Sequence, residues 1–240
     1  MRNIFKKKIM KIFNFYGSGN NKLSLPLLNI ILELYETAQI SFDRYSAQKQ
    51  NGKDAIGSLS SLVRHDLSQY IDIRLFSSDN CQKTNTCVIM PMLPMINIAF
   101  DEHMSLDIDS FLEKINTLFP LEYGFSYSFK LGTSPFSYAM GADNDLKNVM
   151  NISRDMIKLK KWLKVFPNIK NGAIRDIYID NFLNENALNR TIDDISLKQW
   201  IMQSSSRGSL KYCGKLYHWT LPATSIEFVR DELYSLIDTN

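Results

Sequence analysis

Apolar residues at helical spacing predict two helices in the first part of the chain. The first pattern covers residues 23–48, where Pro26 suits the first turn of a helix that begins near Ser24. The second predicted helix covers residues 53–67. These two stretches are therefore expected to be helical.

The pattern then changes to alternation, which is typical of strands. Residues 70–76 alternate between polar and apolar side chains, and the apolar run at 96–100 predicts a second strand. Residues 107–119 return to helical spacing after an acidic start, and Pro120 ends that helix. Residues 123–129 place aromatic side chains on one face only, which predicts a half-buried strand.

The last hundred residues mix both patterns. A long helix is expected over 144–165 and a short one over 197–203. Residues 209–220 predict a hairpin around Gly214. A capping box at Thr224 and Glu227, over residues 224–227, starts a final helix that runs to about residue 237.

Helices and strands follow one another without a regular strand–helix–strand repeat. This order predicts an α+β fold, in which helices accompany an antiparallel sheet and a C-terminal hairpin precedes the last helix. Residues 1–22 are expected to form a flexible basic segment, and residues 23–240 a single α+β domain. A soft sub-boundary is expected at residues 167–172, between Pro167 and Gly172.

Charge is distributed unevenly along the 240 residues. The six charged residues before Glu33 are all basic, and removing them from the 28 lysines and arginines leaves 22, against 25 acidic residues. Two interpretations stay open for residues 2–22. They form a patch that contacts anionic lipid or nucleic acid, or they are a frayed terminus, with Met10 as an alternative to Met1 as the first residue.

The length of the apolar stretches and the number of cysteines indicate the cellular compartment in which the protein is expected. The longest uncharged stretch, residues 84–100, contains two prolines and falls short of the ~20 apolar residues that span a bilayer. The three cysteines, Cys81, Cys87 and Cys213, are an odd count without a secretory signal, which predicts reduced thiols and a cytoplasmic protein. A Cys81–Cys87 bond stays open for an exported chain.

Motifs of known chemistry are lacking in the sequence. The histidines His65, His103 and His218 stand far apart, and the cysteines lack the close pairing of a zinc site. We expect no catalytic residue, cofactor or metal, and His218 is the histidine to watch. Lysines around Trp162 form either a solvated helix face or a phosphate-binding one, and no nucleic-acid partner is expected.

Residues 171–189 and 197–210 mix a buried-looking apolar frame with polar and aromatic side chains. Two interpretations stay open here. The polar groups are internal, with Asp176 or Asn181 capping a helix over residues 182–188, or they form an interface, where Arg and Tyr are favoured.

Three pieces in order, residues 123–141, 172–188 and 197–233, carry a family resemblance through spaced aromatics, Gly, Arg-Asp and Trp. The chain resembles bacterial polymorphic-toxin immunity proteins of the type linked to type VI secretion and Rhs toxins, over residues 95–237. The resemblance implies a non-enzymatic protein that binds and neutralises one cognate toxin protein. The partner-binding candidates are Tyr138, Arg175, Asp176, Tyr178, Asn181 and Arg207.

Two rival functions accompany this expectation. One is an enzyme whose site assembles in space near His218, together with a carboxylate. The other is a membrane-associated or nucleic-acid-associated factor that uses the basic residues 2–22.

Overall fold

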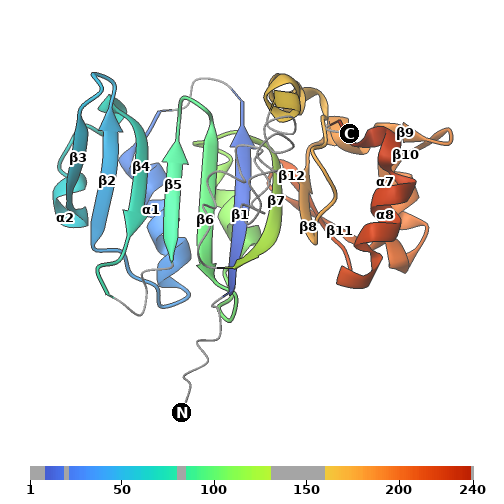
Figure 1. The fold of residues 1–240 in the computed structure, drawn as a ribbon, viewed down its shortest axis with the longest axis horizontal. Coiled ribbons are helices and arrows are strands. Elements are labelled where there is room, and N and C mark those ends of the chain that lie inside the picture. The colour runs from blue at the N-terminus through green and yellow to red at the C-terminus, as the bar shows by residue number, and fades with distance from the viewer. Residues whose placement is uncertain (1–8, 19–21, 80–84, 131–159, 239–240) are drawn as a thin grey trace, which may run out of the picture.

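The computed structural model describes residues 9–18, 22–79, 85–130 and 160–238. Ten strands form one sheet, in the order β11-β12-β8-β7-β1-β6-β5-β4-β2-β3 (Figure 1). Each paired strand runs antiparallel to its neighbour. The strands are β1 Ile9–Gly17, β2 Arg44–Lys49, β3 Asp54–Ser58, β4 Tyr70–Phe76, β5 Thr86–Met90, β6 Met95–Asp101, β7 Leu121–Lys130, β8 Asp180–Leu183, β11 Ser209–Cys213 and β12 Leu216–Thr220.

Short helices and a small second sheet accompany this large sheet. The α-helices are α1 Leu25–Glu36, α2 Leu59–Leu62, α3 Ile108–Ile115, α6 Glu185–Leu188, α7 Leu197–Met202 and α8 Ile226–Glu232. Single 3-10 turns are η1 Leu67–Gln69, η3 Phe166–Asn171, η4 Ser205–Arg207, η5 Ala223–Ser225 and η6 Tyr234–Leu236, and β9 Thr191–Ile192 pairs with β10 Ile195–Ser196. The predicted α+β class, with its antiparallel sheet, is confirmed.

The two best-signalled helices lie where the sequence predicts them. Ser24 caps α1, its side chain accepting from the Leu27 N–H at 3.4 Å, and a proline occupies the first turn. Asp107 caps α3 in the same way, accepting from the Ser110 N–H at 3.1 Å. Helix α1 ends at Glu36, however, and the last part of the predicted helical stretch forms β2 instead.

The helix predicted over residues 53–67 is wrong. Residues 54–58 form β3, which pairs with β2 and alternates between exposed and half-buried positions. Only residues 59–62 are α-helical. The hairpin turn contains Gly52 at φ +78°, a left-handed conformation that glycine adopts without strain. Cross-strand pairing therefore overrides the local helical spacing.

The prediction of a flexible segment over residues 1–22 is wrong for residues 9–17, which form β1 at the centre of the sheet. This strand pairs with β6 on one side and β7 on the other. Ile12, Phe13, Phe15 and Tyr16 are all buried. A strand that is covered on both faces lacks the alternation that marks a half-buried strand, which explains the error.

The end of the chain is partly as predicted. The hairpin β11–β12 and the short helix α7 are confirmed. The capping box over residues 224–227 is wrong, since α8 begins at Ile226 and Ser225 caps it without a side-chain bond. A capping box forms instead at α7, between Ser196 and Gln199. The final helix ends at Glu232, and a 3-10 turn follows.

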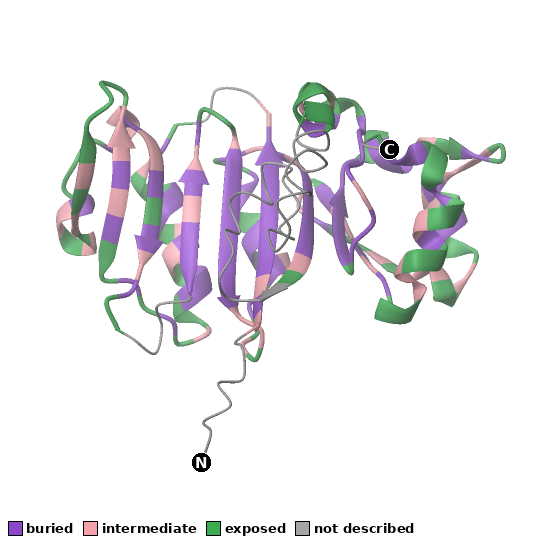
Figure 2. Cartoon of the chain, in the orientation of Figure 1, coloured by how far each residue is buried: buried purple, intermediate pink, exposed green. Residues whose placement is uncertain are grey.

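Two large apolar clusters pack on opposite faces of the sheet, because consecutive residues of a strand point to opposite sides. Phe15 belongs to the cluster beneath α1 and α3, and Tyr16 belongs to the cluster beneath α7 and α8. Figure 2 shows that the buried positions concentrate in the central strands, while the outer strands carry exposed ones. Among the described residues, no helix is both long enough and apolar enough to cross a membrane.

Candidate functional site

Arg175, a predicted partner-binding residue, lies inside the protein. Its side chain is buried, and its guanidinium lies 5.0 Å from the ring centre of Phe125 and 5.4 Å from that of Trp162. The Arg175 N–H also donates to the Tyr123 hydroxyl at 3.1 Å. The positive charge is therefore held against aromatic faces of the fold, an arrangement that stabilises a desolvated cation.

Tyr178 and Asn181 are buried beside it. The Tyr178 ring stacks on Phe125 with 4.2 Å between ring centres. The Asn181 side chain accepts from the Tyr178 N–H at 2.9 Å and donates to the Tyr178 carbonyl at 2.7 Å. The expected helix over residues 182–188 is wrong in its first half, since residues 180–183 form β8 and the cap of α6 is Asn184.

Asp176 and Arg207 lie nearer the surface, and both are bonded within the chain. Asp176 accepts from Nε of Arg230 at 2.7 Å, which closes the segment against α8. The Arg207 guanidinium lies 4.0 Å from the Trp200 ring centre and donates to the Trp200 carbonyl at 3.1 Å. Tyr138, the sixth candidate, lies outside the described residues.

The five described candidates therefore do not form one surface. Arg175, Tyr178 and Asn181 hold the interior beneath β7 and β8, while Arg207 supports the loop between α7 and β11. Their partner-binding role stays a prediction, and the free chain offers little of Arg175 or Asn181 to a partner.

A groove of about 580 Å³ lies beside that loop. Helix α7 provides one wall and the β11–β12 hairpin the other. The lining residues are Lys198, Ile201, Met202, Ser204, Ser205, Gly208, Ser209, Leu210, Tyr212 and Tyr217. Met202 is 72% exposed and Tyr212 is 58% exposed, so two large side chains project into solvent at the groove.

The loop that closes the groove has a fixed conformation. Gly208 lies at φ +90°, and a Cβ on it would meet the Thr220 carbonyl oxygen at 2.1 Å, so only glycine fits. The Trp219 indole N–H donates to the Arg207 carbonyl at 2.7 Å. Together with the stacking of Arg207 on Trp200, these contacts hold the groove in shape without a partner.

His218, the histidine singled out in the sequence, lies between two carboxylates on the opposite face of β12. Its Nδ1 is 2.8 Å from Asp109 Oδ1, and its Nε2 is 3.1 Å from Asp180 Oδ1. Lys11 Nζ lies 3.0 Å from Asp180 Oδ2, and Lys211 Nζ lies 2.6 Å from Asp109 Oδ2. We call these five residues the His218 cluster, and it joins α3, β1, β8, β11 and β12.

The charges of this cluster stabilise one another. Burial on its own would raise the pKa of Asp180, but hydrogen bonds from His218 and Ser126 and the charge of Lys11 hold that pKa far below its usual value. Burial likewise would lower the pKa of His218, and the bonds to Asp180 and Asp109 raise it instead. Both ring nitrogens thus face carboxylates, an arrangement that favours the protonated ring over the neutral one.

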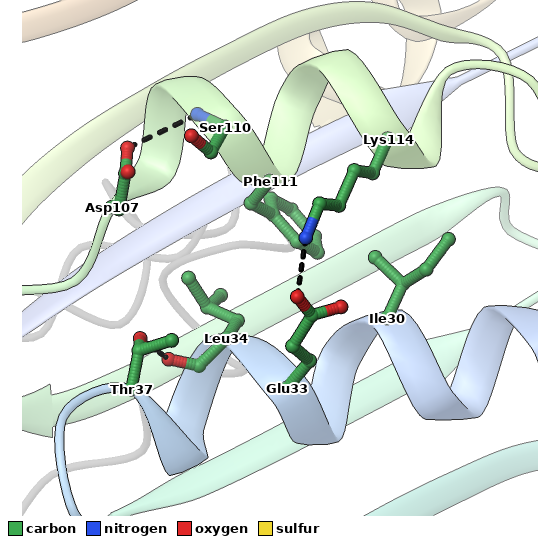
Figure 3. Close-up of a pocket in the computed structure, with 8 residues that line it drawn as sticks. All are labelled: Ile30, Glu33, Leu34, Thr37, Asp107, Ser110, Phe111 and Lys114. Atoms are coloured by element: carbon green, nitrogen blue, oxygen red, sulfur yellow. Dashed lines mark hydrogen bonds and ion pairs between the residues drawn. The ribbon is translucent and has the colours of Figure 1, made fainter.

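A smaller hollow of about 150 Å³ lies between α1 and α3 (Figure 3). Lys114 and Glu33 form an ion pair across it. Asp107 is occupied in capping α3, and the Thr37 hydroxyl donates to the Leu34 carbonyl at 2.7 Å. Its polar side chains are therefore bonded within the chain, and we assign no ligand to it.

The cysteines and the long helix predicted over 144–165 complete the sequence candidates, and Cys213 lies beside Asp109 of the His218 cluster. Cys87 and Cys213 are free and buried, and burial raises the pKa of the Cys213 thiol to about 12, whereas Cys81 lies outside the described residues. No group of metal-ligating side chains gathers in the described parts of the chain. Of the long helix predicted over 144–165, residues 160–165 are described and are helical.

Sequence reasoning missed the groove and most of the His218 cluster. Met202 and Tyr212 are ordinary apolar residues in their segments, and only the pairing of β11 with β12 beside α7 exposes them together. Lys11 and Asp109 lie more than a hundred positions from their partners along the chain. Comparison of the chain with protein-family models, with curated proteins and with solved structures gave no match.

Proposed function

We propose that this protein is a non-enzymatic immunity protein that binds a cognate bacterial toxin and neutralises it in the cytoplasm. The proposal joins the resemblance over residues 95–237 to the groove between α7 and β11. That groove lies within residues 197–233, the third piece of the resemblance. The toxin would belong to the secreted kind that bacteria use in competition, as type VI and Rhs toxins are.

The exposed pair Met202 and Tyr212 is the observation that carries this proposal. Large apolar and aromatic side chains are costly to leave in water, and Tyr and Met are enriched in protein interfaces. Here they flank a hollow of about 580 Å³ whose other lining residues are mostly small or hydroxyl-bearing. Such a surface suits a protein partner that inserts side chains between α7 and the hairpin.

Rigidity of the groove also supports a binding function. Association loses affinity when loops and side chains must be ordered, so a preformed surface binds more tightly. The capping box fixes the start of α7, the Arg207–Trp200 stacking holds the loop on that helix, and the Trp219 bond to the Arg207 carbonyl ties the loop to the hairpin.

The rival functions receive less support from the described residues. His218 uses both ring nitrogens in bonds to Asp109 and Asp180, so neither nitrogen is free to accept a substrate proton. Lys11, part of the basic segment proposed to contact membranes or nucleic acid, lies in β1 and pairs with Asp180.

The test is a growth assay with the protein that co-purifies one-to-one with the tagged chain from its native host. We expect the toxin alone to arrest a bacterial host, and co-expression of this protein to restore growth. Tyr212→Asp combined with Met202→Asp should abolish the rescue, because two carboxylates would be placed in an apolar contact. The control is Ile56→Asp on the opposite edge strand, where Ile56 is 70% exposed. Failure of the unmodified protein to restore growth would contradict the proposal.

A further inference from the structure

Strand β11 is one of the two edges of the ten-stranded sheet. In the described ranges it pairs with β12 alone, and β3 forms the other edge (Figure 1). Alternate residues of an edge strand direct their N–H and C=O groups away from the sheet, where another strand can pair with them. Partners commonly use such edges by adding an extended segment as one more strand.

The groove lies along the same strand. Leu210, Tyr212 and Tyr217 share the face of the hairpin that looks toward α7, where they line the groove with Ile201 and Met202. A strand added to β11 would carry every second side chain on this face. Backbone pairing and side-chain insertion would therefore occur together, at one place.

Natural edge strands are often protected by a lysine, and Lys211 stands at the centre of β11. Here, however, that lysine points to the opposite face. Its Nζ lies 2.6 Å from Asp109 on α3, within the His218 cluster. The groove face of the strand is left to Leu210 and Tyr212, and neither carries a charge.

The charged side chains of β11 and of the groove indicate which kind of partner segment can pair with this edge. A second copy of this chain, paired antiparallel about the middle of β11, would place Lys211 opposite Lys211, and directly opposed like charges destabilise a strand pair. Among the described residues that line the groove, Lys198 is the charged one, and its side chain is 36% exposed. Its Nζ donates to the Tyr217 hydroxyl at 3.2 Å and lies 3.9 Å from the Glu185 carboxylate, whose side chain is 54% exposed. An ammonium has three donors, so this long, exposed ion pair leaves it able to bind a further acidic group. An acidic side chain on the occupant would complement it.

We propose that the toxin, as an extended segment with alternating apolar residues and at least one acidic residue, pairs with β11 as an eleventh strand. The apolar side chains enter the groove between α7 and the hairpin, and the acidic one approaches Lys198. This inference rests on the proposed function, and it adds the mode of binding and the chemistry of the partner segment.

The decisive experiment is amide hydrogen exchange, measured residue by residue on the full chain with and without the partner that co-purifies one-to-one with it from its native host. The β11 amides that do not bond to β12 should exchange rapidly in the free protein. In the complex their exchange should slow by about tenfold or more, because they become hydrogen-bonded.

If the toxin docked through side chains alone, the exchange rates of those β11 amides would not change. The measurement therefore distinguishes side-chain docking from strand pairing. Lys198→Met keeps the side-chain stem and removes the charge, and we expect it to weaken binding about three- to tenfold and to reduce its salt dependence. Binding with unchanged β11 exchange would overturn strand addition and leave the proposed function standing. Failure to bind at all would overturn both.

Discussion

His218 shows at the scale of single residues how charge is used inside this fold. Its side chain is 17% exposed, lies between Asp109 and Asp180, and stacks on Phe182 at 4.4 Å between ring centres. From the sequence, His218 was the histidine to watch, as part of a rival enzyme site assembled in space. The structure places this histidine between two carboxylates at the junction of five elements, and partners so distant along the chain leave no local signal.

The His218 cluster predicts a dependence of stability on pH. The pKa of His218 is raised above its unfolded value of ~6.5, so its contribution is complete below that pH and is lost as pH rises through the folded pKa. The pKa values of Asp180 and Asp109 are lowered, so their contributions are lost only in acid. We expect the free energy of unfolding to fall from pH 6.5 upward.

Urea denaturation at a series of pH values measures this. His218→Gln should lower stability near pH 6 by about 1–3 kcal/mol, because the carboxylates lose a charged partner. The variant should also lack the decline above pH 6.5. An identical decline in the variant would show that another group is responsible.

Arg175 gives a second test at this scale, because its two interpretations predict opposite results. As an internal residue it loses two aromatic contacts in Arg175→Leu, and stability should fall by about 2 kcal/mol or more. Thermal unfolding measures this loss. Unchanged stability combined with lost toxin binding would instead support the interface interpretation.

At the scale of elements, prediction succeeded where local pattern and tertiary pairing agree. Helices α1 and α3 carry capping residues, and β4 and β7 show alternation in the sequence. Strand β1 was missed because it is buried on both faces. Strand β3 was missed because its hairpin partner, and not its own spacing, makes it extended.

Close approach of β1 and β7 gives a prediction at this scale. A Cβ on Gly124 would meet the Phe15 ring at 2.5 Å and the Asn14 carbonyl at 2.9 Å. Gly124→Ala should therefore destabilise the protein by about 1–3 kcal/mol through overpacking. Chemical denaturation measures the change. Ser128→Ala, at an exposed position of the same strand, is the control, and equal effects would argue against close packing as the cause.

At the scale of the whole molecule, one sheet carries an apolar cluster on each face. Its two edge strands differ in their surroundings. The edge at β3 exposes Ile56, while the edge at β11 stands beside a groove and a rigid loop. Residues 197–210 and Arg207, which the sequence singled out, lie beside this groove. The sequence did not indicate Met202 and Tyr212, since their exposure depends on how α7 lies against the hairpin.

The central claim is that this groove binds a toxin. Calorimetric titration of the co-purifying partner into this protein tests it most directly. We expect one-to-one binding, at least tenfold weaker for Tyr212→Asp, equivalent to ~1.4 kcal/mol, and unchanged for Ile56→Asp. The absence of binding, or equal affinities for the two variants, would contradict the claim.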